Sequence, residues 1–263
     1  MIGVNLFGLR QLLKADRSGT LQKLRDIGIE AVEPLVPLGK NKLSALSHEL
    51  EEYRALGFSI PSVHISPSLF GRKPEIISRD LLKIQDLTGI SVFVFSGMFS
   101  KKKAAQKWGN LLGETARATN SSGITVLYHN HTMEFAEVSD SGKAALDCFF
   151  DAAGPDVLLQ LDIGWAGIAG DELAAERKYA DRIAEIHCKD FFEGAKGNYS
   201  VFTMPKTMFA PIGEGVMKTK EVLSHRGELP NFNGAVLIDQ DHSAGNMLHD
   251  IEIGFRNLKE ILP

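Results

Sequence analysis

The sequence predicts an α/β fold, a closed (β/α)8 barrel in which residues 1–263 form a single domain. Strand-like and helix-like segments alternate along the whole chain, at intervals of roughly 30 residues, which is typical of a parallel sheet. The alternation gives about eight units in a chain of 263 residues, as a closed barrel requires. Neither a Gly-x-Gly-x-x-Gly pattern nor a Walker phosphate loop occurs, which disfavours an open, nucleotide-binding sheet.

In the first half of the chain, short apolar strands are followed by amphipathic helices. Ser18 is a candidate cap for the first helix, and Gly28, Gly57 and Gly89 stand where helices commonly end. Pro34 is expected to stop the second strand. The predicted strands are Ile2–Phe7, Glu30–Glu33, Ser59–Ser66 and Ile90–Phe95, and the predicted helices are Thr20–Asp26, Leu43–Leu56, Glu75–Leu87 and Lys103–Thr119.

The second half repeats this order but carries a long polar loop, Phe192–Gly215, after its third strand. The run Ile-Thr-Val-Leu at 124–127 is β-branched and apolar, as expected of a strand buried on both faces. The predicted strands are Ile124–Leu127, Val157–Asp162, Ile183–Lys189 and Ala235–Gln240, and the predicted helices are Lys143–Ala153, Asp171–Ala180, Thr219–His225 and Asn246–Leu262.

The composition is that of an ordinary globular protein, with 44% hydrophobic and 24% charged residues. The formal net charge is -4, and the basic run Lys101–Lys103 is too short for a nucleic-acid footprint, so we expect no nucleic-acid partner. Cys148 and Cys188 have no metal-type spacing and are expected to be free thiols in a reducing compartment.

The N-terminus has no basic segment followed by a long apolar run, and no stretch approaches 18 apolar residues. Secretion and membrane insertion are therefore disfavoured, and we expect a cytoplasmic protein. A homo-oligomer is left open.

Ionisable side chains gather where the predicted strands end. The strand Ile124–Leu127 runs directly into Tyr-His-Asn-His-Thr-Met-Glu-Phe at 128–135, which brings two imidazoles and a carboxylate within six residues. Because the carboxyl ends of parallel strands converge on one mouth of a barrel, these side chains should meet others at strand ends. Those others are Glu33, His64, Ser96, Asp162, His187 with Lys189, and Asp239 with Asp241.

Asp162, His187 and Asp239 on one rim indicate a metal site. Charged side chains that follow apolar strands are costly to bury unless they are paired or bind a metal. A mixed set of carboxylates and imidazoles suits Mn²⁺, Mg²⁺, Co²⁺ or Zn²⁺. Alternation along the strand places Lys189 on the face of His187, where its ammonium could reach a substrate oxygen or a neighbouring carboxylate.

Five short motifs resemble those of a known family, the xylose isomerase-like TIM barrels, and in particular its sugar phosphate isomerase/epimerase branch. They follow the expected order over nearly the whole chain. The motifs are Tyr-His-Asn-His-Thr-Met-Glu-Phe at 128–135, Leu-Asp-Ile-Gly-Trp at 161–165, His-Cys-Lys-Asp at 187–190, Pro-Ile-Gly-Glu-Gly at 211–215 and Ile-Asp-Gln-Asp at 238–241.

The resemblance implies a barrel with one divalent metal ion held by four side chains from the last four strands. Transferred motif by motif, these are Glu134, Asp162, His187 and Asp239. Asp239 departs from the glutamate usual in this branch, so Asp241 or a water could complete the shell. His129 and His131 stand near the place where many epimerases of the wider family carry a metal-binding glutamate, and either could replace Glu134.

The implied chemistry is proton abstraction next to a metal-chelated carbonyl of a sugar or cyclitol. A histidine suits the task of base because its ordinary pKa lies near 7. His131 and His129 are the candidates, with Lys189 opposing negative charge on the substrate. The candidate substrate-binding residues are Glu33, His64, Trp165 and Asp241.

The predicted function is therefore a divalent-metal-dependent sugar isomerase or epimerase with a small-molecule substrate. The alternative is a metal-dependent lyase or dehydratase of a keto-sugar or inosose, because loss of a β-leaving group starts from the same enediolate. Two further hypotheses are an apurinic-site endonuclease, which should show a basic face for the phosphate backbone, and an inactive sugar-binding subunit.

Overall fold

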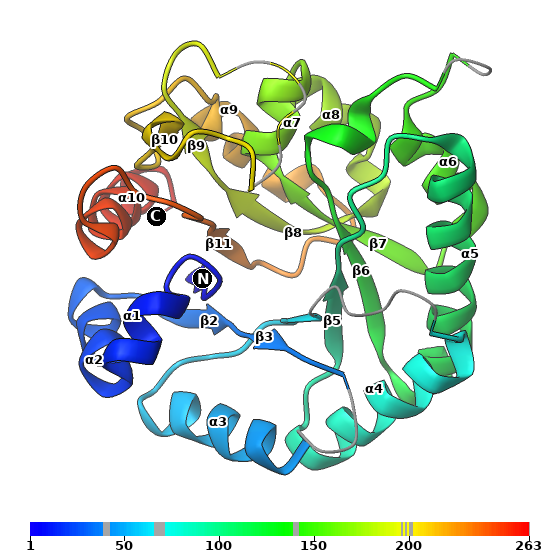
Figure 1. Ribbon diagram of the computed structural model, residues 1–263, viewed down its shortest axis with the longest axis horizontal. Helices are drawn as coiled ribbons and strands as arrows, with labels where there is room; N and C mark the ends of the chain where they lie inside the picture. Colours follow the sequence, from blue (N-terminus) through cyan, green and yellow to red (C-terminus); the bar gives the residue numbers. More distant parts are fainter. Residues whose placement is uncertain are drawn as a thin grey trace.

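A computed structural model of the chain describes residues 1–38, 43–65, 72–138, 142–195, 197, 199 and 202–262. Nine parallel strands form a nearly closed barrel surrounded by helices (Figure 1), which confirms the predicted TIM barrel. The barrel strands are β1 (Ile2–Asn5), β2 (Ala31–Glu33), β3 (Leu35–Val36), β4 (Val63–Ile65), β5 (Val92–Phe95), β6 (Thr125–His129), β7 (Val157–Asp162), β8 (Ile183–Cys188) and β11 (Val236–Ile238).

The ring has the order β2-β1-β11-β8-β7-β6-β5-β4-β3, and it closes at Pro34. This residue separates β2 from β3 because proline has no N–H to donate to a neighbouring strand. β2 pairs with β1, whereas β3 pairs with β4, and the N–H of His64 donates to the carbonyl of Pro34 at 2.9 Å. Pro34 thus ends β2, as predicted, and a separate strand, β3, begins at the next residue. If β2 and β3 are counted as one, the strands fill eight barrel positions.

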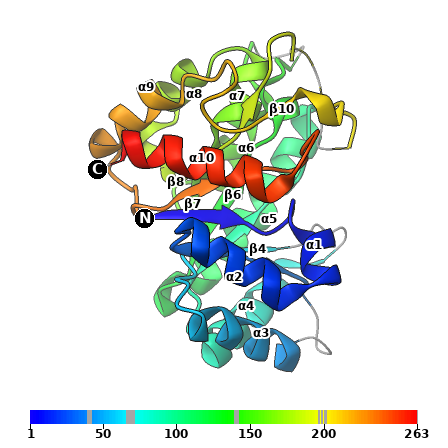
Figure 2. The same ribbon diagram turned by 90° about the vertical axis from the view of Figure 1, so that its left-hand side faces the viewer.

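Helices cover the outside of the ring, as Figures 1 and 2 show from two directions. Between β8 and β11, two short antiparallel strands form a separate sheet. The helices are α1 (Arg10–Ala15), α2 (Arg17–Ile27), α3 (Leu43–Ala55), α4 (Pro74–Thr88), α5 (Lys102–Thr119), α6 (Ala145–Ala153), α7 (Ile163–Ala169), α8 (Glu172–Lys178), α9 (Thr219–Ser224) and α10 (Met247–Ile261), and the two short strands are β9 (Asp190–Phe191) and β10 (Phe209–Ala210).

Helices α5 and α6 pack closely against each other. The buried stripe of α5 recurs at three- and four-residue spacing, as expected for a helix with one face on a core. It includes Ala105, Trp108, Leu112 and Ala116. A Cβ atom on Gly109 would lie 2.3 Å from the carbonyl oxygen of Phe149, and one on Gly113 would lie 2.2 Å from that of Ala153. The two backbones therefore approach more closely than a side chain at either glycine would allow.

The structure contains short elements that periodicity does not predict, namely α1, α7 and the β9–β10 pair. The cap of α2 also differs from the prediction. The carboxylate of Asp16, and not Ser18, accepts the N–H of Gly19 at 2.9 Å, so the helix begins at Arg17. The predicted loop Phe192–Gly215 contains β10, and several of its residues lie outside the described part of the chain.

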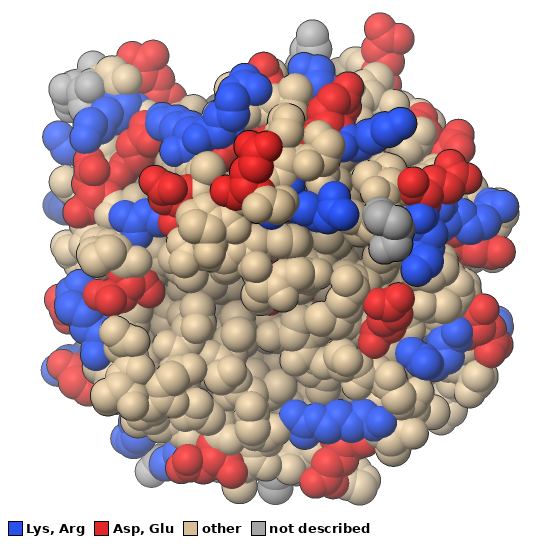
Figure 3. All heavy atoms as spheres, turned by 180° about the vertical axis from the view of Figure 1, so that it is seen from behind, with Lys and Arg blue, Asp and Glu red and all other residues tan. Residues whose placement is uncertain are grey.

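The carboxyl ends of the barrel strands point to the right in Figure 2, the side on which β10 is labelled. On the face seen in Figure 3, acidic and basic side chains are intermixed around a largely uncharged centre. Within the described residues, no helix combines the length and the apolar character needed to cross a membrane.

Candidate metal centre

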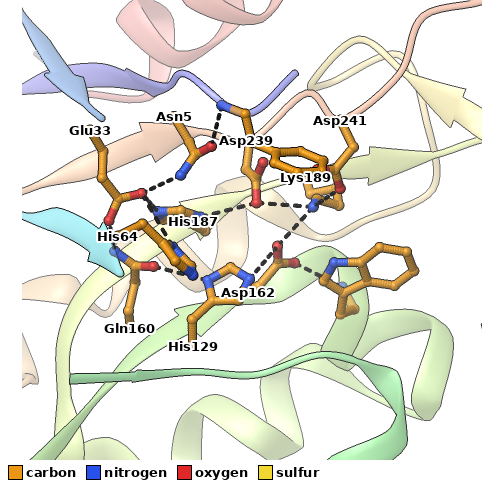
Figure 4. A network of polar contacts seen from close by, with 12 residues as sticks. Asn5, Glu33, His64, His129, Gln160, Asp162, His187, Lys189, Asp239 and Asp241 are labelled. Atoms are coloured by element: carbon orange, nitrogen blue, oxygen red, sulfur yellow. Dashed lines mark hydrogen bonds and ion pairs between the residues drawn. The ribbon is translucent and has the colours of Figure 1, made fainter. Parts of the chain in front are cut away.

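Four buried side chains from neighbouring barrel strands converge at the mouth (Figure 4). His129 ends β6, Asp162 ends β7, His187 lies in β8 and Asp239 follows β11. Each offers one ligand atom, and these atoms all lie within 4.8 Å of one another. The strand register brings them together, since Asp162 is the Cα partner of His187, and the N–H of Asp239 donates to the carbonyl of Cys188. Two imidazoles and two carboxylates at this spacing can share one divalent ion.

The two carboxylate oxygens of Asp162 have different surroundings, one at the start of a helix and the other in this cluster. Oδ1 accepts the N–H of Trp165 at 2.9 Å and so caps α7. Oδ2 is buried and has no hydrogen bond to any described residue, although Nζ of Lys189 lies 3.3 Å away. A buried carboxylate oxygen without a hydrogen bond costs free energy unless a cation binds it. Oδ2 of Asp162 therefore fits the role of a metal ligand.

Gln160, in the middle of β7, holds the His129 ring in one tautomer. Its Nε2 donates to Glu33 at 2.7 Å and to Glu185 at 2.8 Å, which fixes the orientation of the amide. Its Oε1 lies 2.9 Å from Nδ1 of His129. Because an amide oxygen only accepts, Nδ1 carries the proton. Nε2 of His129 therefore keeps its lone pair for the cluster and lies 3.9 Å from Oδ2 of Asp162.

Glu33 lies beneath His187 and helps to fix the orientation of its ring, as Gln160 does for His129. Its Oε2 lies 3.0 Å from Nε2 of His187 as an ion pair that lacks the alignment of a hydrogen bond, and it accepts from Nδ2 of Asn5. Nδ1 of His187 lies 3.1 Å from Oδ2 of Asp239. Burial lowers the pKa of His187, but the Glu33 and Asp239 carboxylates outweigh burial and raise this pKa to about 10. The ring is thus held from both sides.

Lys189 lines the pocket and forms ion pairs with three carboxylates. Its Nζ lies 3.0 Å from Asp239, 3.3 Å from Asp162 and closer still to Asp241. The ammonium also lies 4.9 Å from the centroid of the Trp165 ring, in a cation–π contact. Together, the Lys189 ammonium and the protonated His187 ring face four carboxylates, those of Glu33, Asp162, Asp239 and Asp241, which leaves two negative charges for a dication to offset. An ion that binds through the His187 ring would displace one of its two ring protons. The donor set and its charge therefore fit a divalent metal ion.

His131 and Glu134 form a second pair beside the cluster. Glu134 accepts the O–H of Tyr128 at 2.6 Å and the N–H of His131 at 3.1 Å, and burial raises its pKa to about 7. Nδ1 of His131 lies 3.9 Å from Oε1 of Glu134 and has no hydrogen bond to a described residue. Burial and the charge of Lys189 lower the pKa of His131 to about 3, so its ring is neutral near pH 7.

A pocket opens directly onto these groups. Two predicted substrate-binding residues, Glu33 and Trp165, are fully buried and lie outside its lining. Glu33 lies beneath His187, whereas the Trp165 ring packs 5.1 Å from that of Phe191. The predicted residues that line the pocket are His64, His129, His131, Lys189, Asp239 and Asp241, and the lining also includes Asn5, Phe7, Leu35, Ser96, Met98 and Phe202.

A sequence model of the xylose isomerase-like TIM barrel family matches residues 21–259. The chain belongs to this family. No curated protein matches the sequence. Among solved structures, the fold is similar to that of a sugar phosphate isomerase/epimerase from Parabacteroides distasonis. That likeness has a TM-score of 0.78 at 18% identity and covers 98% of this chain and 95% of that chain.

Two further solved structures are similar over almost the whole chain. One is a D-psicose 3-epimerase in the presence of D-fructose, with a TM-score of 0.65, 15% identity, and 98% of this chain and 96% of that chain covered. The other is a xylose isomerase-like TIM barrel protein from Mycobacterium smegmatis in complex with magnesium, with a TM-score of 0.66, 16% identity, and 99% and 96% covered. At these identities the likeness establishes a shared fold.

Within the xylose isomerase-like family, this chain presents two candidate sets of metal ligands. The structure brings Asp162, His187 and Asp239 together as the family motifs predict. The fourth member of the cluster is His129, whereas the Glu134 carboxylate faces Tyr128 and the backbone of His131. The geometry therefore favours the alternative in which His129 replaces Glu134.

The residues beneath the cluster were missed because each has only a weak signal in the sequence. Gln160 interrupts the apolar strand Val157–Asp162, and an amide in a buried strand indicates a specific hydrogen-bond partner. Glu185 interrupts β8 in the same way. Asn5 ends β1 as the other site residues end their strands, so the strand-end rule could have found it. Nothing in the sequence around Met98 marks it as a pocket residue.

Proposed function

We propose that this protein is a divalent-metal-dependent sugar isomerase or epimerase. The observation that carries the proposal is the cluster of His129, Asp162, His187 and Asp239, which is buried next to a pocket lined also by His131. Two imidazoles and two carboxylates suit Mn²⁺, Co²⁺ or Zn²⁺ better than Mg²⁺, which prefers oxygen ligands. The sugar epimerases among the proteins of similar fold agree with this function.

A divalent cation held there would polarise a sugar carbonyl and the neighbouring hydroxyl group. His131 is the candidate base, because it lines the pocket and its neutral ring keeps Nδ1 without a hydrogen bond among the described residues. The C–H bond next to the carbonyl breaks, the proton passes to the imidazole nitrogen, and the electron pair enters the enediolate. Return of this proton from the imidazolium to the adjacent carbon would give an isomer, whereas an epimer would require a second acid that protonates the opposite face of the same carbon.

Lys189 and His64 would orient the substrate. The Lys189 ammonium lines the pocket, where it can oppose the negative charge that develops on a substrate oxygen. Nε2 of His64 lies 3.1 Å from Oγ of Ser96, and both side chains line the pocket, so they offer a donor and an acceptor to sugar hydroxyl groups.

The proposal is tested by hydrogen exchange at the carbon next to the carbonyl. The protein is loaded with Mn²⁺ and incubated in D₂O with D-fructose, D-psicose or a cyclitol ketone, and the sugars are followed by NMR. We expect deuterium in an isomerised or epimerised skeleton, loss of exchange in EDTA, and loss in an Asp162→Asn control. A metal-loaded protein that exchanges no deuterium into any of these ketones would contradict the proposal.

The same experiment separates the alternative functions. Release of water or of a glycoside from the substrate would identify the lyase or dehydratase. The apurinic-site endonuclease gains no support from charge, because the formal net charge is -4. Steeply salt-dependent binding to an abasic duplex would favour it instead.

A further inference from the structure

The two arcs of the barrel mouth differ in chemistry. The candidate ligands come from β6, β7, β8 and β11, which are neighbours in the ring. The other arc, from β1 to β5, contributes three apolar side chains to the same pocket, Phe7 after β1, Leu35 in β3 and Met98 after β5, together with the polar side chains of Asn5, His64 and Ser96. All three of these apolar side chains are only partly buried, so they present apolar surface to whatever occupies the pocket. A substrate bound at the metal would therefore meet these three apolar side chains, as well as polar groups, on its far side.

Met98 adopts an unusual backbone conformation in this arc. Its φ is 48°, the only positive φ of a residue other than glycine among the described residues. Such a conformation costs about 1–3 kcal/mol and persists only where the surroundings impose it. Here the N–H of the preceding Gly97 donates to the hydroxyl of Tyr128 at 3.1 Å, and Tyr128 in turn donates to Glu134. The site itself thus holds the turn that places Met98 in the pocket.

The charges in the pocket disfavour an anionic substrate. Lys189 is the only lysine or arginine in the described lining, and three carboxylates already surround its ammonium. A dication in the cluster would offset the remaining negative charge and leave no excess positive charge for a phosphate group. Arg10 lies 4.1 Å from the centroid of the Phe7 ring and donates to the carbonyl of Phe7, but it is not part of the lining.

We infer that the substrate is an uncharged sugar that carries an apolar substituent, and that Phe7, Leu35 and Met98 contact this substituent. The inference rests on the proposed function, since it takes the metal cluster as the place where the sugar oxygens bind. These three apolar side chains supply binding energy for the substituent, because burial of apolar surface is favourable in proportion to its area. A phosphate ester would instead lose its hydration without gaining a cationic partner.

The test is a binding experiment that needs no turnover. The Mn²⁺-loaded protein is titrated by calorimetry or ligand-observed NMR with methyl β-D-glucopyranoside, phenyl β-D-glucopyranoside and D-glucose 6-phosphate. We expect the phenyl glycoside to bind about tenfold more tightly than the methyl glycoside, as burial of a phenyl ring predicts, and the phosphate to bind most weakly. Met98→Ala should reduce the phenyl preference about fivefold.

Two further variants keep the test decisive. Leu35→Ala should reduce the phenyl preference in the same direction, so the inference does not depend on the folding of Met98→Ala alone. Met247→Ala is the matched control, because Met247 lies at the start of α10 and outside the pocket lining, and it should leave the preference unchanged.

Tighter binding of the phosphate ester, equal binding of the two glycosides, no binding of the phenyl glycoside, or an unchanged preference in both pocket variants would overturn the inference. Failure of the proposed function has a different signature. In that case the protein would not bind metal, or it would not exchange deuterium into the substrate. The titrations would then be repeated on metal-free protein, and the phenyl glycoside would still bind more tightly than the methyl glycoside.

Discussion

His129 and Glu134 compete for the role of fourth metal ligand, and the two can be separated by single substitutions. The ligand atom of His129 lies within 4.8 Å of those of Asp162, His187 and Asp239, whereas Glu134 is engaged by Tyr128. We expect His129→Ala to weaken Mn²⁺ binding by about 100-fold or more, because removing even an indirect partner of a ligand costs about 10–100-fold. Glu134→Gln should change the affinity by less than about threefold. Calorimetric titration with Mn²⁺ measures both, and the opposite pattern would restore Glu134 as the ligand.

His131 is predicted to act on the substrate and not on the metal. Its ring is neutral near pH 7 and lines the pocket, so His131→Gln should remove the base and leave the cluster intact. The rate of deuterium incorporation should fall by about 10²–10⁴-fold, the usual effect of losing a general base. The Mn²⁺ affinity should stay unchanged.

The control for this substitution is His225→Gln. His225 is only partly exposed and pairs with Glu176 at 3.1 Å on another part of the molecule, and its replacement should alter neither quantity. A His131→Gln protein that exchanges deuterium at the normal rate would exclude His131 as the base and leave His129 as the remaining candidate.

At the scale of elements, Asp190 joins β9 to the loop that follows β10. Its buried carboxylate accepts backbone N–H groups of Phe191, Gly213, Gly215 and Met217. Asn at this position keeps one acceptor oxygen and turns an NH₂ group toward some of these donors. We therefore expect Asp190→Asn to lower the free energy of unfolding by about 2–4 kcal/mol, since each buried unsatisfied donor costs about 1–3 kcal/mol.

Asp171→Asn is the matched control for the Asp190 substitution. Asp171 also accepts two backbone N–H groups, but at the exposed start of α8, where asparagine caps a helix as well as aspartate does. Its substitution should change the free energy of unfolding by less than about 0.5 kcal/mol. Equal effects of the two substitutions in denaturant unfolding would show that the carboxylate of Asp190 is not needed to hold the loop.

Elements with a strong apolar period could be predicted from the sequence, and short ones could not. The glycines after α2 and α4 have φ values of 104° and 73°, as expected where helices end. α7 has only seven residues, two of them glycine, and it forms because Asp162 caps it and β7 supports it. β9 and β10 have two residues each and are defined by their mutual hydrogen bonds, so tertiary contacts decide their conformation.

At the scale of the molecule, the barrel topology made the candidate site predictable. Parallel strands deliver their last residues to one mouth, so Asp162, His187 and Asp239 could be placed together although 77 positions separate the first from the last. The choice between His129 and Glu134 could not be made in this way. It depends on side-chain contacts, such as the contact between Tyr128 and Glu134, that form only when the strands are packed.

Metal binding should also stabilise the whole barrel, because the candidate ligands come from β6, β7, β8 and β11 and an ion would connect four neighbouring strands. By mass action, Mn²⁺ at 100 times its dissociation constant should add about 2.7 kcal/mol to the free energy of unfolding. For a chain of 263 residues this corresponds to a rise in Tm of about 5–10 °C, reversed by EDTA.

Asp162→Asn and Asp239→Asn should abolish the rise, because each removes a ligand charge from the cluster. Asp171→Asn, which lies outside the cluster, should retain it. If all three variants gain the same Tm on adding Mn²⁺, the ion binds elsewhere and the cluster is held together by its own ion pairs.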